Sequence, residues 1–110
     1  MSPRSAASSG SARVFAALGD ETRLRLVERL SRGGPASMGK LAEGSDVSRQ
    51  AIAKHLGVLE DAGLVRSRRS GRSNVYRLET HRLLIAQGFL DRMSQRWDSA
   101  LNRLRDLVEG

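Results

Sequence analysis

The sequence predicts a mainly α-helical fold with one small β-hairpin, in a single domain that ends in a long helix. Three observations predict it. Apolar residues recur at spacings of three and four along most of the chain, which is the period of an amphipathic helix. Strand-forming residues gather only over residues 65–78, on both sides of the turn sequence Ser70-Gly71-Arg72. A chain of 110 residues, 39% of them hydrophobic, ordinarily forms one domain with a modest core.

The N-terminal third contains an expected tail and two expected helices. Residues 1–11 are mostly Ser, Ala and Gly, so we expect a disordered tail before a domain that spans residues 12–110. A first helix begins near Ala12. Its apolar face consists of Val14, Phe15 and Leu18. Asp20 is a favourable N-cap for a second helix, which the sequence Gly33-Gly34-Pro35 ends.

Residues 37–62 have the composition of a helix-turn-helix. A short helix is expected from about Ser37, followed by a tight turn at Gly44-Ser45-Asp46. Ser48 then caps a longer helix over residues 48–62, and Gly63 follows where a helix C-terminus favours a left-handed residue. Two short helices joined by about four residues around a glycine are typical of this motif.

The positive charge of the chain is concentrated in one region. The formal net charge is +7, and residues 48–78 hold seven Lys or Arg against two acidic residues. This window therefore carries +5 of the +7, and the rest of the chain is nearly neutral. A localised basic region indicates a polyanionic partner, either nucleic acid or an anionic membrane surface.

The outward positions of the second motif helix suit the recognition of DNA bases. Arg49 can bond guanine bidentately and Gln50 can bond adenine in the same way, while the small Ala53 permits close approach to the groove. Ser48 at the cap can contact a phosphate. The predicted DNA-contacting residues of this helix are Ser48, Arg49, Gln50, Ala53, Lys54 and His55. The alternative is that they form a solvated helix face, and for His55 that it is a structural histidine.

The predicted hairpin over residues 65–78 is strongly basic. It contains five arginines between Arg66 and Arg77 with no acidic residue among them, and these would repel each other without a counter-charge. A DNA phosphate backbone would supply that charge. We expect Arg68, Arg69 and Arg72 to contact it. The alternative is an edge hairpin whose arginines deter aggregation.

The terminal helix, expected over residues 80–109, carries a sustained apolar heptad stripe. The stripe comprises Leu83, Ala86, Leu90, Met93, Trp97, Ala100, Leu104 and Leu107, widened by Phe89, Leu101 and Val108. A helix of this length spans roughly 40 Å, more than so small a body covers, so we expect a homodimer. The predicted interface residues are Val14, Phe15, Leu18, Leu90, Met93, Trp97, Ala100, Leu101 and Leu104. The alternative is an ordinary amphipathic helix folded on its own domain.

Residues 12–80 resemble the ArsR/SmtB family of winged helix-turn-helix regulators, most specifically in the block VSRQAIAKHLGVLEDAGLV. The resemblance implies a homodimer, usually a repressor, that contacts double-stranded DNA through the helix starting at Ser48 and through the hairpin. A two-fold dimer would place two recognition helices about one DNA turn apart, so the expected operator is an inverted repeat. The terminal helix with Trp97 is similar to that of a branch without metal sites.

The composition gives little support for a metal site or a catalytic site. The chain has no cysteine and only two histidines, and His81 with Glu79 or Asp91 would make at most a weak metal site. No phosphate-binding loop or nucleophile motif is present, so we expect a non-enzyme without cofactors. The N-terminus lacks a signal-peptide pattern and no apolar stretch is long enough for a membrane span, so a cytoplasmic protein without membrane contact is expected.

Two other functions remain open from the sequence. The chain could be a small-molecule-responsive switch of the same fold, with Met38, Phe89 and Met93 lining a pocket between the terminal helix and the helix-turn-helix. It could instead be a protein-interaction module that uses the helix over residues 80–109 to bind a different helical partner.

Overall fold

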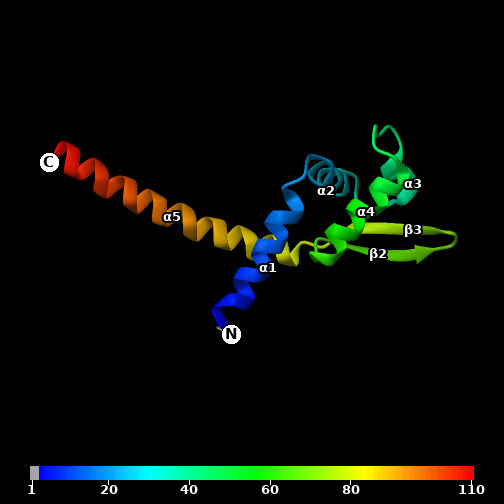
Figure 1. Ribbon diagram of the computed structural model, residues 1–110, viewed down its shortest axis with the longest axis horizontal. Coiled ribbons are helices and arrows are strands. Elements are labelled where there is room, and N and C mark those ends of the chain that lie inside the picture. The colour runs from blue at the N-terminus through cyan, green and yellow to red at the C-terminus, as the bar shows by residue number, and fades with distance from the viewer. Residues whose placement is uncertain (1–2) are drawn as a thin grey trace.

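The computed structural model describes residues 3–110, with side chains from residue 10 onward. A small body of helices and one sheet carries a long helix that projects away from it (Figure 1). The elements in chain order are α1 (Pro3–Leu18), α2 (Glu21–Gly33), β1 (Ala36–Ser37), α3 (Met38–Ala42), α4 (Arg49–Asp61), β2 (Val65–Ser70), β3 (Ser73–Leu78) and α5 (His81–Glu109). The predicted mainly helical fold with a hairpin is confirmed.

Local sequence signals position the starts and ends of these helices. The Oδ2 of Asp20 accepts a hydrogen bond of 3.0 Å from the backbone N–H of Arg23 at the start of α2. The Oγ of Ser48 accepts one of 3.2 Å from the N–H of Ala51 at the start of α4. Each bond satisfies a donor that the first helical turn leaves free. Gly63 follows α4 with φ +78°, the left-handed conformation that its position predicts.

α1 begins earlier than the sequence predicts. The expected disordered tail covered residues 1–11, whereas the structure has a continuous helix from Pro3; residues 1–2 lie outside the described part of the chain. Alanine is the best helix former, and proline is tolerated in the first turn of a helix, where its missing N–H has no intrahelical acceptor. α1 packs against α5, and Ser11 is buried. The C-terminal half of α1 is thus held by packing, and the helix continues from it back to Pro3.

The sheet has three antiparallel strands in the order β1-β3-β2. β2 and β3 form the predicted hairpin, closed by the two-residue loop Gly71-Arg72. Gly71 has φ +61° and Arg72 has no positive φ, which is the pattern of a type II′ turn. The third strand, β1, was not predicted because two residues, Ala36 and Ser37, are too short for an alternating pattern.

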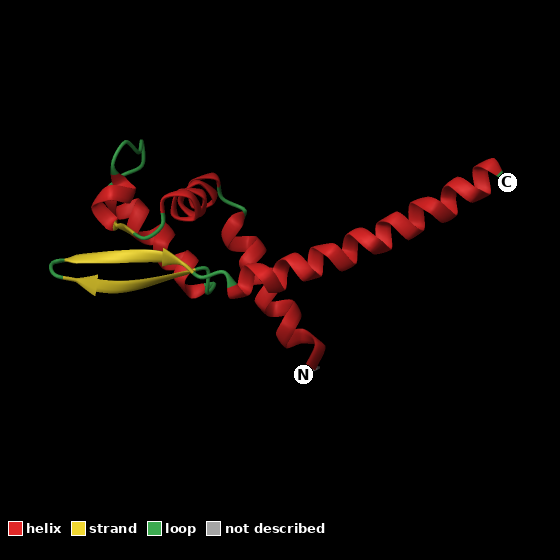
Figure 2. Cartoon of the chain, turned by 180° about the vertical axis from the view of Figure 1, so that it is seen from behind, coloured by secondary structure: helices red, strands yellow, loops and turns green. Residues whose placement is uncertain are grey.

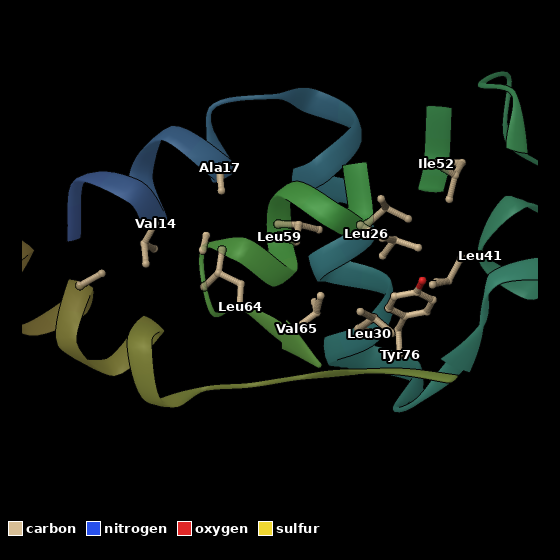
Figure 3. Close-up of a cluster of buried hydrophobic side chains, with 13 residues drawn as sticks. Val14, Ala17, Leu26, Leu30, Leu41, Ile52, Leu59, Leu64, Val65 and Tyr76 are labelled. Carbon is tan, nitrogen blue, oxygen red and sulfur yellow. The ribbon is translucent and has the colours of Figure 1, made fainter. Parts of the chain in front are cut away.

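The hydrophobic core lies between α2, α4 and the sheet, and α1 extends it toward α5 (Figure 3). Leu56 and Leu59 of α4 and Leu64 before β2 are completely buried. Tyr76 of β3 closes the core on the sheet side. α4 is thus anchored along one face, which leaves its opposite face free.

α5 is the outlying element of the fold. Of its 29 residues, only Ala86 is buried. The projecting helix makes the molecule elongated, with dimensions of 66 × 35 × 21 Å. The hairpin extends from the body in the opposite direction (Figure 2). No helix in residues 3–110 is long and apolar enough to cross a membrane.

Candidate nucleic-acid interface

The outward face of α4 is exposed to solvent. Ile52, Leu56 and Leu59 hold the other face in the core. Four of the predicted contact residues are exposed on the outward side: Arg49, Gln50, Ala53 and Lys54. They occupy positions i, i+1, i+4 and i+5, which lie on one side of a helix. The structure therefore brings these four predicted residues together on one exposed strip.

Ser48 and Arg49 occupy the N-terminal end of this strip. The Ser48 hydroxyl oxygen accepts the cap hydrogen bond from Ala51, so its O–H remains able to donate to a phosphate oxygen. The Arg49 guanidinium lies over α3, where a Cβ built on Gly39 would be 3.3 Å from its Nη2. Because Gly39 has no Cβ, the Arg49 guanidinium has room beside α3.

His55 is oriented toward the protein's own body. Its Nδ1 accepts a hydrogen bond of 3.2 Å from Nη1 of Arg23 and lies 3.7 Å from Oδ2 of Asp20. The backbone N–H of Arg23 is the main cause that lowers the pKa of the Asp20 carboxyl, and the positive charge of the Arg23 guanidinium adds to it. This placement favours the alternative of a structural histidine, since the imidazole joins α4 to the start of α2, and the DNA contact of His55 stays a prediction.

The hairpin distributes its arginines over two faces and a tip. Directly opposed residues of an antiparallel pair lie on one face. Arg68 is opposite Val75, whereas Arg69 is opposite Asn74 on the face that carries the buried Tyr76. Arg72 occupies the loop at the tip, and all three arginines are exposed. The predicted contact residues are therefore accessible but point in different directions.

Two acidic residues outside the hairpin bind it, and one of them neutralises an arginine. Arg66 and Arg77 stand directly opposite each other, which would destabilise the hairpin if neither were neutralised. The Arg66 Nε lies 3.0 Å from Oε2 of Glu79, the residue that follows the hairpin. Glu60 of α4 accepts a hydrogen bond of 2.9 Å from the hydroxyl of Ser67. The count over residues 48–78 included Glu60 but not Glu79, which is one residue beyond that window.

The predicted interface residues lie on α1 and α5 and differ in how far they are buried. Val14 is 1% exposed and belongs to the core of its own protomer, so it leaves no surface for a partner and that prediction is corrected. Phe15 and Leu18 are half-buried against the core, and the Phe15 ring is 6.0 Å from that of Phe89. Along α5, Ala100 is half-buried, and the exposed predicted residues are Leu90, Met93, Trp97, Leu101 and Leu104.

The three residues predicted to line a pocket between α5 and the helix-turn-helix lie on different parts of the molecule. Met38 packs against the core from α3, while Phe89 and Met93 lie on α5. Figures 1 and 2 both place α3 and α5 on opposite sides of the body. These three side chains therefore do not line one cavity.

Comparisons with known proteins agree with this geometry. The helix-turn-helix domain family matches residues 18–68. The chain is 40% identical over 97 residues to the HTH-type transcriptional regulator Rv2034 of Mycobacterium tuberculosis, covering 88% of this chain and 87% of that protein. It is also 40% identical to the ArsR-like transcriptional regulator from Rhodococcus sp. RHA1, with a TM-score of 0.77 over 90% of this chain and 92% of that one. The chain belongs to the ArsR family of winged helix-turn-helix transcriptional regulators.

A further similar structure is that of a possible ArsR-family transcriptional regulator, solved in solution. The winged helix-turn-helix domain of Mb0332 from Mycobacterium bovis, described as homodimeric and DNA-binding, is 28% identical, with a TM-score of 0.67 over 86% of this chain and 90% of that one. In winged helix-turn-helix terms, α4 of the present chain is the recognition helix and the β2–β3 hairpin is the wing. Within residues 3–110, no group of three His, Cys, Asp or Glu side chains could hold a metal ion.

Proposed function

We propose that this ArsR-family chain is a dimeric, sequence-specific regulator that binds double-stranded DNA at an inverted repeat and represses transcription in the cytoplasm. The observation that carries the proposal is the exposed strip of Arg49, Gln50, Ala53 and Lys54 on a recognition helix whose other face is fixed in the core. The role consists of binding and includes no catalytic step.

The strip supplies donors and acceptors for base recognition in a major groove. Arg49 is suited to the O6 and N7 of guanine, and Gln50 to the N6 and N7 of adenine. Ala53 leaves space for the helix to approach the base edges, and Lys54 carries a positive charge toward the phosphates. Because Ile52, Leu56 and Leu59 fix the helix in the body, these side chains enter the groove in one orientation.

The wing supplies contacts that depend little on sequence. Arg68, Arg69 and Arg72 are exposed and lie on both faces and at the tip of the hairpin. This distribution suits a hairpin that lies along a groove with phosphates on both sides, rather than one that meets a flat surface. Arg66 is paired with Glu79 and would hold the end of the hairpin nearest the body in position.

A second copy of the chain is the proposed partner of α5. Leu90, Trp97, Leu101 and Leu104 are each more than half exposed, and Leu107 is 80% exposed, which leaves a long apolar stripe uncovered by the body. Such a stripe is typical of a surface buried by association. The homodimeric relative from Mycobacterium bovis supports the same assembly. A two-fold dimer presents two recognition helices, and a repressor of this kind acts by covering the operator.

The proposal is tested by sedimentation and by DNA titration of the full chain. We expect a dimer in analytical ultracentrifugation, and binding to a labelled duplex that weakens steeply with salt because released counterions drive it. A monomer at concentrations where DNA is bound would contradict the dimeric part. A dimer without affinity for any duplex at low salt would contradict the DNA-binding part and would favour the protein-interaction module.

A further inference from the structure

A groove on the side of the body, here called the α1–α4 groove, is formed by the C-terminal halves of α1 and α4 and the start of α2. Its volume is about 550 Å³, which is in the range of small-molecule sites. The lining residues that matter are Arg13, Ala16, Arg23, Val58, Asp61 and Ala62. None of them belongs to the exposed strip of α4 or to the wing.

The middle of the groove is apolar. Ala16 of α1 is exposed and Ala62 after α4 is buried, so two small side chains leave the space open. Val58 is 41% exposed on the face of α4 that borders the groove. A large apolar side chain so exposed beside a hollow provides a surface that a hydrophobic ligand would cover.

The rim of the groove is cationic. Within residues 10–110 neither Arg13 nor Arg23 forms an ion pair. Arg23 is held by neutral acceptors, with its Nε 2.6 Å from the carbonyl oxygen of Ala17 and its Nη1 3.2 Å from Nδ1 of His55. Both guanidinium groups thus lack a bound carboxylate. Asp61 on the same rim places one negative charge nearby, and Asp20, whose Oδ2 lies 3.7 Å from Nδ1 of His55, places a second one near Arg23.

We propose that the α1–α4 groove binds a small carboxylic acid with an apolar body, such as a medium-chain aliphatic or an aromatic carboxylate. The guanidinium groups would bind the carboxylate, because Arg and carboxylate form short charge-assisted hydrogen bonds. Ala16, Ala62 and Val58 would cover the apolar part. Asp61 disfavours a dianion such as a phosphate ester, because its like charge would lie at the same rim.

The ligand would act on DNA binding through Arg23. This side chain joins the carbonyl end of α1 to His55 of the recognition helix. A carboxylate on Arg23 would compete with these neutral acceptors and would change how α4 is held. This consequence rests on the proposed function, whereas occupation of the groove does not.

Octanoate is the probe, with 1-octanol as its uncharged counterpart, added to the full chain below the micelle concentration. We expect saturable shifts of the backbone amide signals of Ala16, Ala17, Val58 and Ala62 in heteronuclear NMR with octanoate, and at least tenfold weaker binding of octanol. Arg13→Gln should weaken octanoate about tenfold or more, because one charge-assisted bond is lost. Ala16→Leu should also weaken it by filling the groove.

Arg32→Gln is the matched control, since Arg32 is an exposed arginine at the far end of α2. It should leave octanoate affinity unchanged. Equal affinity in wild type, Arg13→Gln and Ala16→Leu, or no saturable shift at these residues, would overturn the proposal. Octanoate that binds here but leaves the affinity for a labelled duplex unchanged would overturn the coupling through Arg23. A chain that binds octanoate and no duplex at all would overturn the proposed function and leave the groove site standing.

Discussion

The guanidinium of Arg23 donates a hydrogen bond of 3.2 Å to Nδ1 of His55, although 32 residues separate them in the chain. The same guanidinium donates to the carbonyl oxygen of Ala17 at the end of α1. One side chain therefore connects the first helix, the second helix and the recognition helix. The contact gives His55 a role in holding α4 against the body.

His55→Ala should reduce stability and leave the ionic part of DNA binding unchanged. The lost hydrogen bond to a charged donor is expected to lower the free energy of unfolding by about 1–3 kcal/mol. Chemical denaturation measures this loss. The slope of binding affinity against salt should stay at the wild-type value, whereas a slope lower by about one unit would show that His55 neutralises a phosphate.

Asp20 should make stability depend on pH in the acid range. Its pKa is lowered in the folded protein, mainly by the backbone N–H of Arg23, so the ionised carboxylate stabilises the fold above the ordinary value of 3.8. That contribution is lost as the pH falls through the folded value. Asp20→Asn keeps a favourable N-cap but does not titrate. Denaturant unfolding at neutral and acid pH should therefore show a smaller acid loss in Asp20→Asn than in wild type, and identical losses would refute this role.

Arg49→Ala and Gln50→Ala should weaken binding to the cognate site by about 1–3 kcal/mol each and relax the preference at one base pair. The reason is that each removes a bidentate contact to a base edge. Fluorescence anisotropy on the cognate duplex and on single-base variants measures both effects. Equal losses on cognate and unrelated DNA would instead assign these side chains to the phosphate backbone.

Arg69→Ala and Arg72→Ala should weaken binding to every sequence alike. Each removes one proposed phosphate contact, so the salt slope should fall by about one unit. Arg66→Ala is the matched comparison within the hairpin, because Arg66 is already paired with Glu79 and should change the slope less. A preference that changes at particular base pairs would show that Arg69 or Arg72 contacts bases.

Trp97→Ala and Val14→Ala should separate the proposed dimer surface from the protomer core. Trp97 is 63% exposed, so its removal should raise the dimer dissociation constant measured by sedimentation, with little loss of protomer stability. Val14 is 1% exposed, so Val14→Ala should lower the free energy of unfolding by about 2 kcal/mol through lost burial and the cavity left behind. An unchanged dimer in Trp97→Ala would refute the assignment of α5.

The features predicted well from the sequence are those that neighbouring residues determine. Asp20 and Ser48 cap helices through bonds to residues three positions away, and Gly63 takes the conformation that its place after a helix requires. The exposed strip of α4 follows from helical periodicity alone. Each of these signals lies within a few residues of the feature that it predicts.

The features that the sequence missed depend on contacts between distant elements. The orientation of His55 depends on Arg23, and the burial of Val14 depends on which side of α1 meets the body. β1 exists only because Ala36 and Ser37 pair with β3. The opposite orientations of Arg68 and Arg69, by contrast, follow from strand alternation and could have been predicted.

Selection of binding sites from random double-stranded DNA by the full chain, at a low and a physiological salt concentration, tests the central claim most directly. The account predicts enrichment of an inverted repeat whose half-sites are centred about one helical turn apart, retained at the higher salt concentration. Binding without any enriched sequence, which disappears at physiological salt, would contradict it and would show that the basic face contacts DNA only non-specifically.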